Sequence, residues 1–410
     1  MAADRASPSD ARMNTVDPET MLAAAYLSRV AEPASLPVFL LVHQLGYLAA
    51  AEAIRSGDVT AEVRQATEAR RTDTDAEADL EAAERNDIRL ITALSDEWPH
   101  YAFAAMHAVA DRRIAEWLAG GRKRPDRGEL IPPLALWLKG NGDLSGVGVR
   151  SAAVVGSRAA TAYGEHVAAD LAYGLASRDV TVVSGGAHGI DAAAHRGALS
   201  AGGTSVLVSA GGLDRPYPSA NELLYSRTAE SGVLVSERPP GSAPHRQRFL
   251  SRNRLIAALG SATLVVEAAQ RSGALNSARY ARDLGRPVLA VPGPVTSAMS
   301  TGCHQLIQRE ENPAVLVTGL SDVLPYCGSL GEGRELACEP AAVNDYDGLD
   351  EAARAVLDGF PAHSPVTESD LARLSGRPVR EVLVSLPTLR QLGLITVSRE
   401  GYRRSTRVAS

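Results

Sequence analysis

The sequence predicts an α/β protein in which a doubly wound, mostly parallel sheet lies between a small helical domain and a small C-terminal winged helix. Three observations predict this architecture. Six short apolar runs rich in β-branched residues recur at intervals that leave room for a helix, which is typical of buried parallel strands. Helical periodicity fills the chain before these runs, and a three-helix pattern with a hairpin follows them.

The first part of the chain is expected to be a disordered tail at 1–17 followed by a helical domain over 18–129. Charges of both signs at 62–87 are interpreted as a solvated helical face. Apolar residues follow helical spacing at Met21, Leu22, Ala25, Leu27 and Val30, over 36–42, and again at Leu48, Ala51 and Ile54.

The central domain is expected over 130–326. Leucines at 134, 136 and 138 alternate around Trp137, which indicates an edge strand that leads into this domain. Because the later apolar runs do not alternate and are separated by helix-length segments, they predict a Rossmann-like sheet with ligands outside the carboxyl ends of its strands. The six predicted strands are 152–155, 180–183, 205–208, 233–235, 264–266 and 288–291.

Residues 327–348 are rich in Gly, Glu, Asp and Pro and lack hydrophobic periodicity, which predicts a linker. The winged helix is expected over 349–410. Pro387 falls inside its third helical stripe, so that helix is expected to be split or shortened there. A capping box at 367–370 begins the second helix, Gly393 ends the third, and 394–397 and 402–404 form a hairpin about a turn at 399–401.

Composition limits the classes of function. The formal net charge of −6 gives no overall attraction to a polyanion, so nucleic-acid binding requires a local basic patch. The three cysteines show no spacing typical of a disulfide framework or a zinc site, so no metal is expected. The N-terminus does not resemble a signal peptide, and no apolar run approaches the roughly 18 residues of a membrane span. The chain is therefore expected to be cytoplasmic, with no membrane partner.

Two glycine-rich turns follow the first and second predicted strands, where backbone N–H groups at a helix N-terminus can hold an anion. Their glycine spacing differs from the GxGxxG dinucleotide fingerprint and no acidic ribose partner follows, so no nicotinamide cofactor is expected. Either turn, taken alone, also fits glycines that serve only a tight turn. The turns contain Gly156, Ser157 and Arg158, and Gly185, Gly186 and Gly189, respectively.

The most basic local segment spans 238–254. It contains five arginines and no acidic residue, with Phe249 among them, in a chain that is otherwise acidic. A groove for single-stranded nucleic acid uses this combination, since phosphates attract cations and exposed bases stack on aromatic faces. A solvated basic surface without a ligand has the same composition. His188 and His195 flank Asp191, but no nucleophile or metal ligand accompanies them, and they are interpreted as hydrogen-bonded helix residues.

The order of short motifs along the chain resembles the DprA/Smf family of DNA-processing proteins. The resemblance covers about 130–310 and extends less strongly to both flanking domains, the first of which is similar to the family's sterile-alpha-motif-like (SAM-like) extension. It rests on Gly156-Ser157-Arg158, 184–191, 212–214 with Tyr217-Pro218, 249–254, 265–268 with Ser272-Gly273, and 290–293.

This resemblance implies a homodimer that is not an enzyme, binds single-stranded DNA at the carboxyl edge of the sheet, and helps load the bacterial recombinase during natural transformation. Three departures occur: Leu250 stands where the family has proline, Arg246 where it often has lysine, and His304 where it has asparagine. The resemblance implies phosphate contacts from Gly156, Ser157, Arg158, Gly185, Gly186, Gly189, Ser272 and Gly273, and a groove lined by Arg246, Arg252, Asn253, Arg254 and a base-stacking Phe249.

Two other functions stay open. A nucleoside-monophosphate phosphoribohydrolase-like enzyme also uses a Rossmann sheet with glycine-rich turns near a glutamate, here Glu267, although its Pro-Gly-Gly-x-Gly-Thr loop does not occur. A transcriptional regulator would use the winged helix to bind DNA and the Rossmann-like domain as a ligand sensor. Affinity that rises with oligonucleotide length would separate the recombination mediator from the enzyme.

Overall fold

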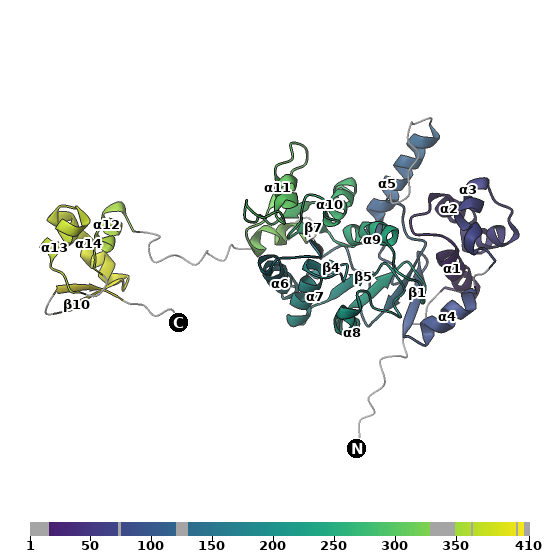
Figure 1. The fold of residues 1–410 in the computed structure, drawn as a ribbon, viewed down its shortest axis with the longest axis horizontal. Coiled ribbons are helices and arrows are strands. Elements are labelled where there is room, and N and C mark those ends of the chain that lie inside the picture. The colour runs from purple at the N-terminus through teal and green to yellow at the C-terminus, as the bar shows by residue number, and fades with distance from the viewer. Residues whose placement is uncertain are drawn as a thin grey trace, which may run out of the picture. The chain divides into compact units, whose positions relative to one another are not determined.

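The structure is a computed structural model that describes residues 16–72, 75–119, 130–328, 349–361, 364–398 and 401–405. The chain divides between 336 and 337 into two compact units (Figure 1). Most of the predicted tail at 1–17 and of the predicted linker at 327–348 lies outside the described residues, as do Cys338 and residues 399 and 400 of the predicted turn.

One sheet of nine strands forms the centre of the first unit, in the order β1-β2-β6-β5-β4-β3-β7-β8-β9. β2 pairs antiparallel with both β1 and β6, and every other pair is parallel. This mostly parallel sheet with flanking helices confirms the predicted fold class. The strands are β1 (Ile88–Thr92), β2 (Ala135–Lys139), β3 (Ser151–Val155), β4 (Thr181–Ser184), β5 (Ser205–Val208), β6 (Val233–Ser236), β7 (Ala262–Val265), β8 (Val288–Ala290) and β9 (Val315–Leu316).

Three strands differ from the expectation. β1 lies at the end of a segment in which helical periodicity prevails, and β9 has only two residues, too few for a pattern. Because β2 pairs with β1 on one side and with β6 on the other, it is an internal strand, and its predicted position at the edge of the sheet is wrong. Trp137 of β2 is accordingly 0% exposed. A domain boundary at 129/130 stays a prediction, and strands from both sides of it share this sheet.

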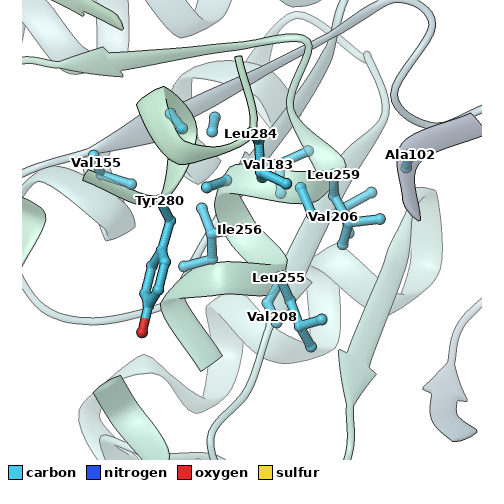
Figure 2. Close-up of a cluster of buried hydrophobic side chains, with 14 of the residues drawn as sticks. Ala102, Val155, Val183, Val206, Val208, Leu255, Ile256, Leu259, Tyr280 and Leu284 are labelled. Atoms are coloured by element: carbon cyan, nitrogen blue, oxygen red, sulfur yellow. The ribbon is translucent and has the colours of Figure 1, made fainter. Parts of the chain in front are cut away.

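Helices cover both faces of the sheet because successive side chains of a strand point to opposite faces. On one face Val155, Val183 and Val206 pack near Leu255 and Ile256 of α9 (Figure 2). On the opposite face the buried cluster contains residues of α6 and α7. These helices are α6 (Ala162–Ala176), α7 (Ile190–Ser200), η2 (Ser219–Asn221), α8 (Glu222–Ser231), α9 (Arg246–Leu259), α10 (Ala274–Asp283), α11 (Thr301–Ile307), η3 (Leu320–Asp322) and η4 (Leu324–Tyr326).

Further helices form the N-terminal part of this unit. The α2 helix joins both predicted apolar runs across a kink at Gly46, where φ is 78°. Among the described helices, α2 alone is long and apolar enough to cross a membrane. This is weak evidence for a membrane span, because Val38, Ala51 and Ile54 of α2 belong to the protein core. The helices are α1 (Pro18–Val30), α2 (Leu36–Ser56), α3 (Ala61–Thr67), η1 (Glu68–Arg70), α4 (Ala76–Glu84) and α5 (His100–Leu118).

The second unit has its own buried cluster, which includes Val356, Leu371 and Leu389. Its elements follow the predicted order, but their assignment as a winged helix stays a prediction. The third helix runs through Pro387 without a break, so the expected split is wrong. Proline has no N–H to donate to the carbonyl oxygen of Leu383, but both residues are exposed, so water can bind that oxygen. The elements are α12 (Glu351–Asp358), α13 (Glu368–Ser375), α14 (Val379–Gln391), β10 (Ile395–Ser398) and β11 (Gly401–Arg404).

Candidate nucleic-acid interface

A cavity of about 690 Å³ lies at the carboxyl ends of β3 and β7. The chain continues from β3 to β4 on one side and from β7 to β8 on the other, so the connections diverge at this point and leave a crevice. Residues 156–159 form one wall, 269–274 a second, and the first half of α9 a third. The cavity is therefore where the sheet topology predicts a ligand.

An aromatic pair lines this cavity, and two arginines lie close to one of its rings. The rings of Tyr217 and Phe249 are tilted, with centroids 5.5 Å apart. The Cζ atom of Arg158 lies 4.7 Å from the Phe249 centroid, and that of Arg252 lies 5.9 Å from it. Tyr217 is 48% exposed and Phe249 is partly buried, so aromatic surface stays open to a ligand. A base can stack on this surface while its phosphate meets an arginine.

Arg252 is a buried cation in the cavity lining. It is 5% exposed, and its Nε has no hydrogen-bond partner among the described residues. Burial lowers the pKa of Arg252 and raises that of Asp191, and the opposite charges of the two groups counter both effects. Gly185 makes room for this side chain, since a Cβ at 185 would lie 1.6 Å from Arg252 Nη1. A phosphate oxygen in the cavity offers the guanidinium a charged acceptor.

Two helices begin at the cavity. α9 starts at Arg246 and α10 at Ala274, and both residues belong to the lining. Neither first turn contains an acidic residue, and neither helix has a side-chain cap. The positive ends of the two helix dipoles therefore add to the arginine charges, and together they favour an anion.

Most of the predicted site residues meet at this cavity. Asn253 also joins two of its walls, because its Nδ2 donates to the Gly273 carbonyl oxygen at 3.4 Å. The structure does not bring Gly185, Gly186, Gly189 or Arg254 into the lining. The predicted residues that line it are Gly156, Ser157, Arg158, Arg246, Phe249, Arg252, Asn253, Ser272 and Gly273.

The two glycine-rich turns pack against each other. Gly189 has a φ of 72°, and a Cβ there would lie 2.3 Å from the Ser157 carbonyl oxygen. A Cβ at Gly156 would lie 2.4 Å from Cγ1 of Ile190. The Ser157 N–H donates to the Glu267 carbonyl oxygen at 2.7 Å, so it is already engaged within the protein. These glycines thus allow close backbone packing beneath the cavity.

Three of the five arginines in 238–254 point away from the cavity. Arg238 is 2% exposed and donates to the carbonyl oxygens of Ser28 and Ala31. Arg248 is 7% exposed and pairs with a carboxylate of the N-terminal part. Arg254 is 0% exposed, and its Nη2 lies 2.5 Å from Oε1 of Glu237. Of the five arginines in this segment, only Arg246 and Arg252 therefore line the cavity, where a ligand can contact them.

Several lining residues escaped the sequence prediction, and among them Tyr217, His245 and Arg271 each carry an aromatic ring or a guanidinium group. Tyr217 belongs to a quoted family motif, and its aromatic ring was the available signal. Arg271 directly precedes the predicted Ser272-Gly273 turn, so its position also pointed to it. His245 precedes α9, and only the fold shows that this residue turns toward the cavity.

Two of the other polar candidates, His195 and His304, have structural partners. His195 is 0% exposed, its Nδ1 lies 2.7 Å from Ser205 Oγ, and burial lowers its pKa to about 3. Nε2 of His304 lies 3.0 Å from the Gly293 carbonyl oxygen, which joins α11 to the turn after β8. His188 is exposed. In the described part of the chain no group of three or more His, Cys, Asp and Glu side chains could hold a metal ion.

Glu267 supports the start of α6. It is 3% exposed, and its two carboxylate oxygens accept from the N–H and the hydroxyl of Thr161, each at 2.8 Å. Thr161 in turn caps α6. The Glu267 side chain does not belong to the cavity lining.

Comparisons with known proteins identify the family of the chain. Residues 129–327 match the family model for DNA recombination-mediator protein A. A Mycobacterium tuberculosis protein named 'Putative DNA processing protein DprA' is 48% identical to this chain, over 96% of both chains. The protein Smf of Escherichia coli is 38% identical, over 67% of this chain and 72% of its own. The X-ray structure of DprA from Streptococcus pneumoniae superposes with a TM-score of 0.58 and 29% identity, over 76% of this chain and 98% of that one. The chain therefore belongs to the DprA/Smf family of DNA recombination mediators.

Proposed function

We propose that the protein binds single-stranded DNA in the cavity at the carboxyl edge of its sheet, and that it protects incoming DNA and helps load the recombinase during transformation and homologous recombination. We further infer that it acts in the cytoplasm, as a homodimer and not as an enzyme. The observation that carries the proposal is the aromatic pair Tyr217 and Phe249, whose Phe249 ring lies near the guanidinium groups of both Arg158 and Arg252. Membership of a family of recombination mediators supports it.

The chemistry of the cavity favours a single strand over a duplex. Stacking on Phe249 requires a base whose face is exposed, and the bases of a duplex already stack on one another. The lining supplies cations and helix N-termini for phosphates, and stacking on an aromatic face tolerates any base. We assign phosphate contacts to Arg158, Arg246 and Arg252 and base stacking to Phe249, with Asn253 and the Ser272-Gly273 turn completing the groove.

The full chain is expected to bind single-stranded oligonucleotides more tightly than duplexes of equal length, with little dependence on base composition, because phosphate and stacking contacts carry no sequence information. A gel-shift series with matched single strands and duplexes, at one stated salt concentration, measures this preference. Equal or tighter binding of the duplex would contradict the proposed function.

Replacing Phe249 with alanine is expected to weaken single-strand binding by about 1–3 kcal/mol, the cost of losing one stacked base. The dependence of affinity on salt should stay nearly the same, because no phosphate contact and no counterion are involved. Fluorescence anisotropy with a labelled oligonucleotide at several salt concentrations gives both quantities.

The matched control for Phe249 is Leu250→Ala. Leu250 lines the same cavity and is 43% exposed, but it has no aromatic face, so its loss should cost much less than that of Phe249. Phe249→Tyr keeps the ring and should bind like the original protein. Similar losses for the alanine variants at 249 and 250 would show that apolar contact, and not stacking, holds the base.

The alternative functions have less support. The phosphoribohydrolase hypothesis depended on Glu267, whose carboxylate is occupied by Thr161 and lies outside the cavity lining. The regulator hypothesis needs polar side chains on the helix that reads a DNA groove. On α14, the corresponding helix of the second unit, Arg380 and Arg390 are exposed, but the exposed Leu383 and Val384 between them cannot hydrogen-bond to a base edge.

A further inference from the structure

The first turn of α9 carries two ligand-facing residues, Arg246 and Phe249, under unfavourable electrostatic conditions. A helix N-terminus is the positive end of the helix dipole, where cations are destabilising. This turn nevertheless contains Arg246 and Arg248, has no acidic residue, and follows His245, which makes no side-chain cap. The turn therefore needs a negative charge from elsewhere in the chain to stay ordered.

Glu32, in the connection between α1 and α2, supplies that charge. Its carboxylate accepts from both Nε of Arg248, at 3.0 Å, and Nη2 of Arg248, at 2.8 Å, in a bidentate pair. Nη1 of Arg248 donates to the Ala243 carbonyl oxygen at 2.7 Å, so the same guanidinium also holds the segment that precedes α9. Nη1 of Arg70 also pairs with Oε1 of Glu32, at 2.8 Å.

The rest of the segment 237–245 is tied to the same N-terminal part. Nη1 of Arg238 lies 2.6 Å from the carbonyl oxygens of both Ser28 and Ala31, at the end of α1. In the reverse direction, Nη2 of Arg29 donates to the Pro240 carbonyl oxygen at 2.7 Å. The end of α1 thus holds the first part of the segment that leads into the cavity, and Arg248 of α9 holds its later part at Ala243.

We propose that Glu32 is a positioning residue for DNA binding: it touches no DNA itself, but it fixes the first turn of α9 through Arg248 and so holds Phe249 and Arg246 in the cavity. This inference rests on the proposed function and adds to it a role for the N-terminal helical part. Burial works to raise the pKa of Glu32, but hydrogen bonds and charges from Arg248 and Arg238 hold it at about 2, so the carboxylate is ionised at neutral pH.

The sign of one substitution distinguishes this role from simple electrostatics. Removing a negative charge from a protein strengthens its attraction to a polyanion. If Glu32 positions α9, however, Glu32→Gln lowers the affinity for single-stranded oligothymidylate, by about tenfold, which corresponds to about 1.4 kcal/mol. The matched control is Glu81→Gln, which removes the same charge from an exposed ion pair between Glu81 of α4 and Arg85. This variant is expected to bind with equal or slightly higher affinity.

Two further measurements exclude a merely structural effect. In the free protein, hydrogen exchange at the amides of residues 249–252 is faster in Glu32→Gln than in the original protein, while the amides of the sheet are unchanged. In a background of Phe249→Ala, the Glu32→Gln effect on affinity becomes smaller than in the original protein, because the ring is already gone and only the positioning of Arg246 remains to be lost. Should Glu32→Gln fail to fold, Arg248→Lys keeps the charge but loses the bidentate fork, and it is expected to act in the same direction.

The outcomes separate this inference from the proposed function. Unchanged or increased affinity in a folded Glu32→Gln variant, with unchanged exchange in α9, overturns the positioning role while leaving single-strand binding intact. If the original protein binds no single-stranded DNA, the proposed function fails. In that case exchange in the free protein alone decides whether Glu32 orders the first turn of α9, and unchanged exchange overturns that role too.

Discussion

Replacing Arg254 with methionine is expected to lower the free energy of unfolding of the first unit by about 3–5 kcal/mol, the cost of breaking a buried ion pair by removing one partner. The Arg254 side chain is 0% exposed and that of Glu237 is 9% exposed, so the substitution leaves a carboxylate buried without its partner. Burial already raises the pKa of Glu237, and the Arg254 charge opposes that rise. Denaturant titration followed by tryptophan fluorescence reports on this unit, because all three tryptophans lie within it.

A double substitution provides the control. Adding Glu237→Gln to Arg254→Met removes the buried charge that the single change leaves, so part of the lost stability should return. The measurement also decides between two roles for Arg254. If Arg254→Met keeps full stability but loses single-strand affinity, then Arg254 contacts DNA, as the family resemblance implies, and the buried pair is not its function.

Replacing Arg252 with alanine is expected to weaken single-strand binding by roughly 1.5–3 kcal/mol, the contribution of a hydrogen bond to a charged group. The logarithmic salt dependence should become shallower by about 0.7, since one phosphate contact to a single strand is lost. The effect should equal or exceed that of an exposed arginine, because burial strengthens a charged interaction and the Nε of Arg252 has no partner within the described protein. Anisotropy titrations between low and moderate salt measure both values.

Two variants accompany the Arg252 experiment. Arg178→Ala removes the same charge beyond the C-terminal end of α6, which is the end opposite the cavity, and should change neither affinity nor salt dependence. Arg252→Lys keeps the charge without the planar fork and should recover part of the affinity. Wild-type affinity and salt dependence in Arg252→Ala would mean that DNA does not enter this cavity. The stability of Arg252→Ala must be measured in parallel, because the change leaves Asp191 buried without an opposite charge.

The strands of the sheet were predictable because buried parallel strands are continuous apolar runs, and all six predicted runs overlap an observed strand. β1 was not predictable in this way: its residues Ile88–Thr92 follow a charged helical segment, and its place in the sheet depends on pairing with β2, far along the chain. Similarly, β9 obtains its strand geometry from β8 rather than from its own two residues.

The site was predictable in its location but not in the assignment of each arginine. Turns at the ends of β3 and β7 must meet once the sheet order is known, which places Arg158 near Ser272. Helical spacing also groups Arg246 with Phe249 and Asn253 on one side of α9. The partner of Arg248, however, is Glu32, more than two hundred residues away, and no local pattern shows which cation will find such a partner.

The close approach of Gly185 to Arg252 also fixes where the Arg252 guanidinium lies. A Cβ at 185 would lie 1.6 Å from Nη1 of Arg252, so any side chain there would push the flexible end of the arginine aside. Gly185→Ala would therefore keep the cation but move its charge relative to the rest of the cavity lining. The missing side chain at 185 thus sets the direction of a charge that belongs to a different residue.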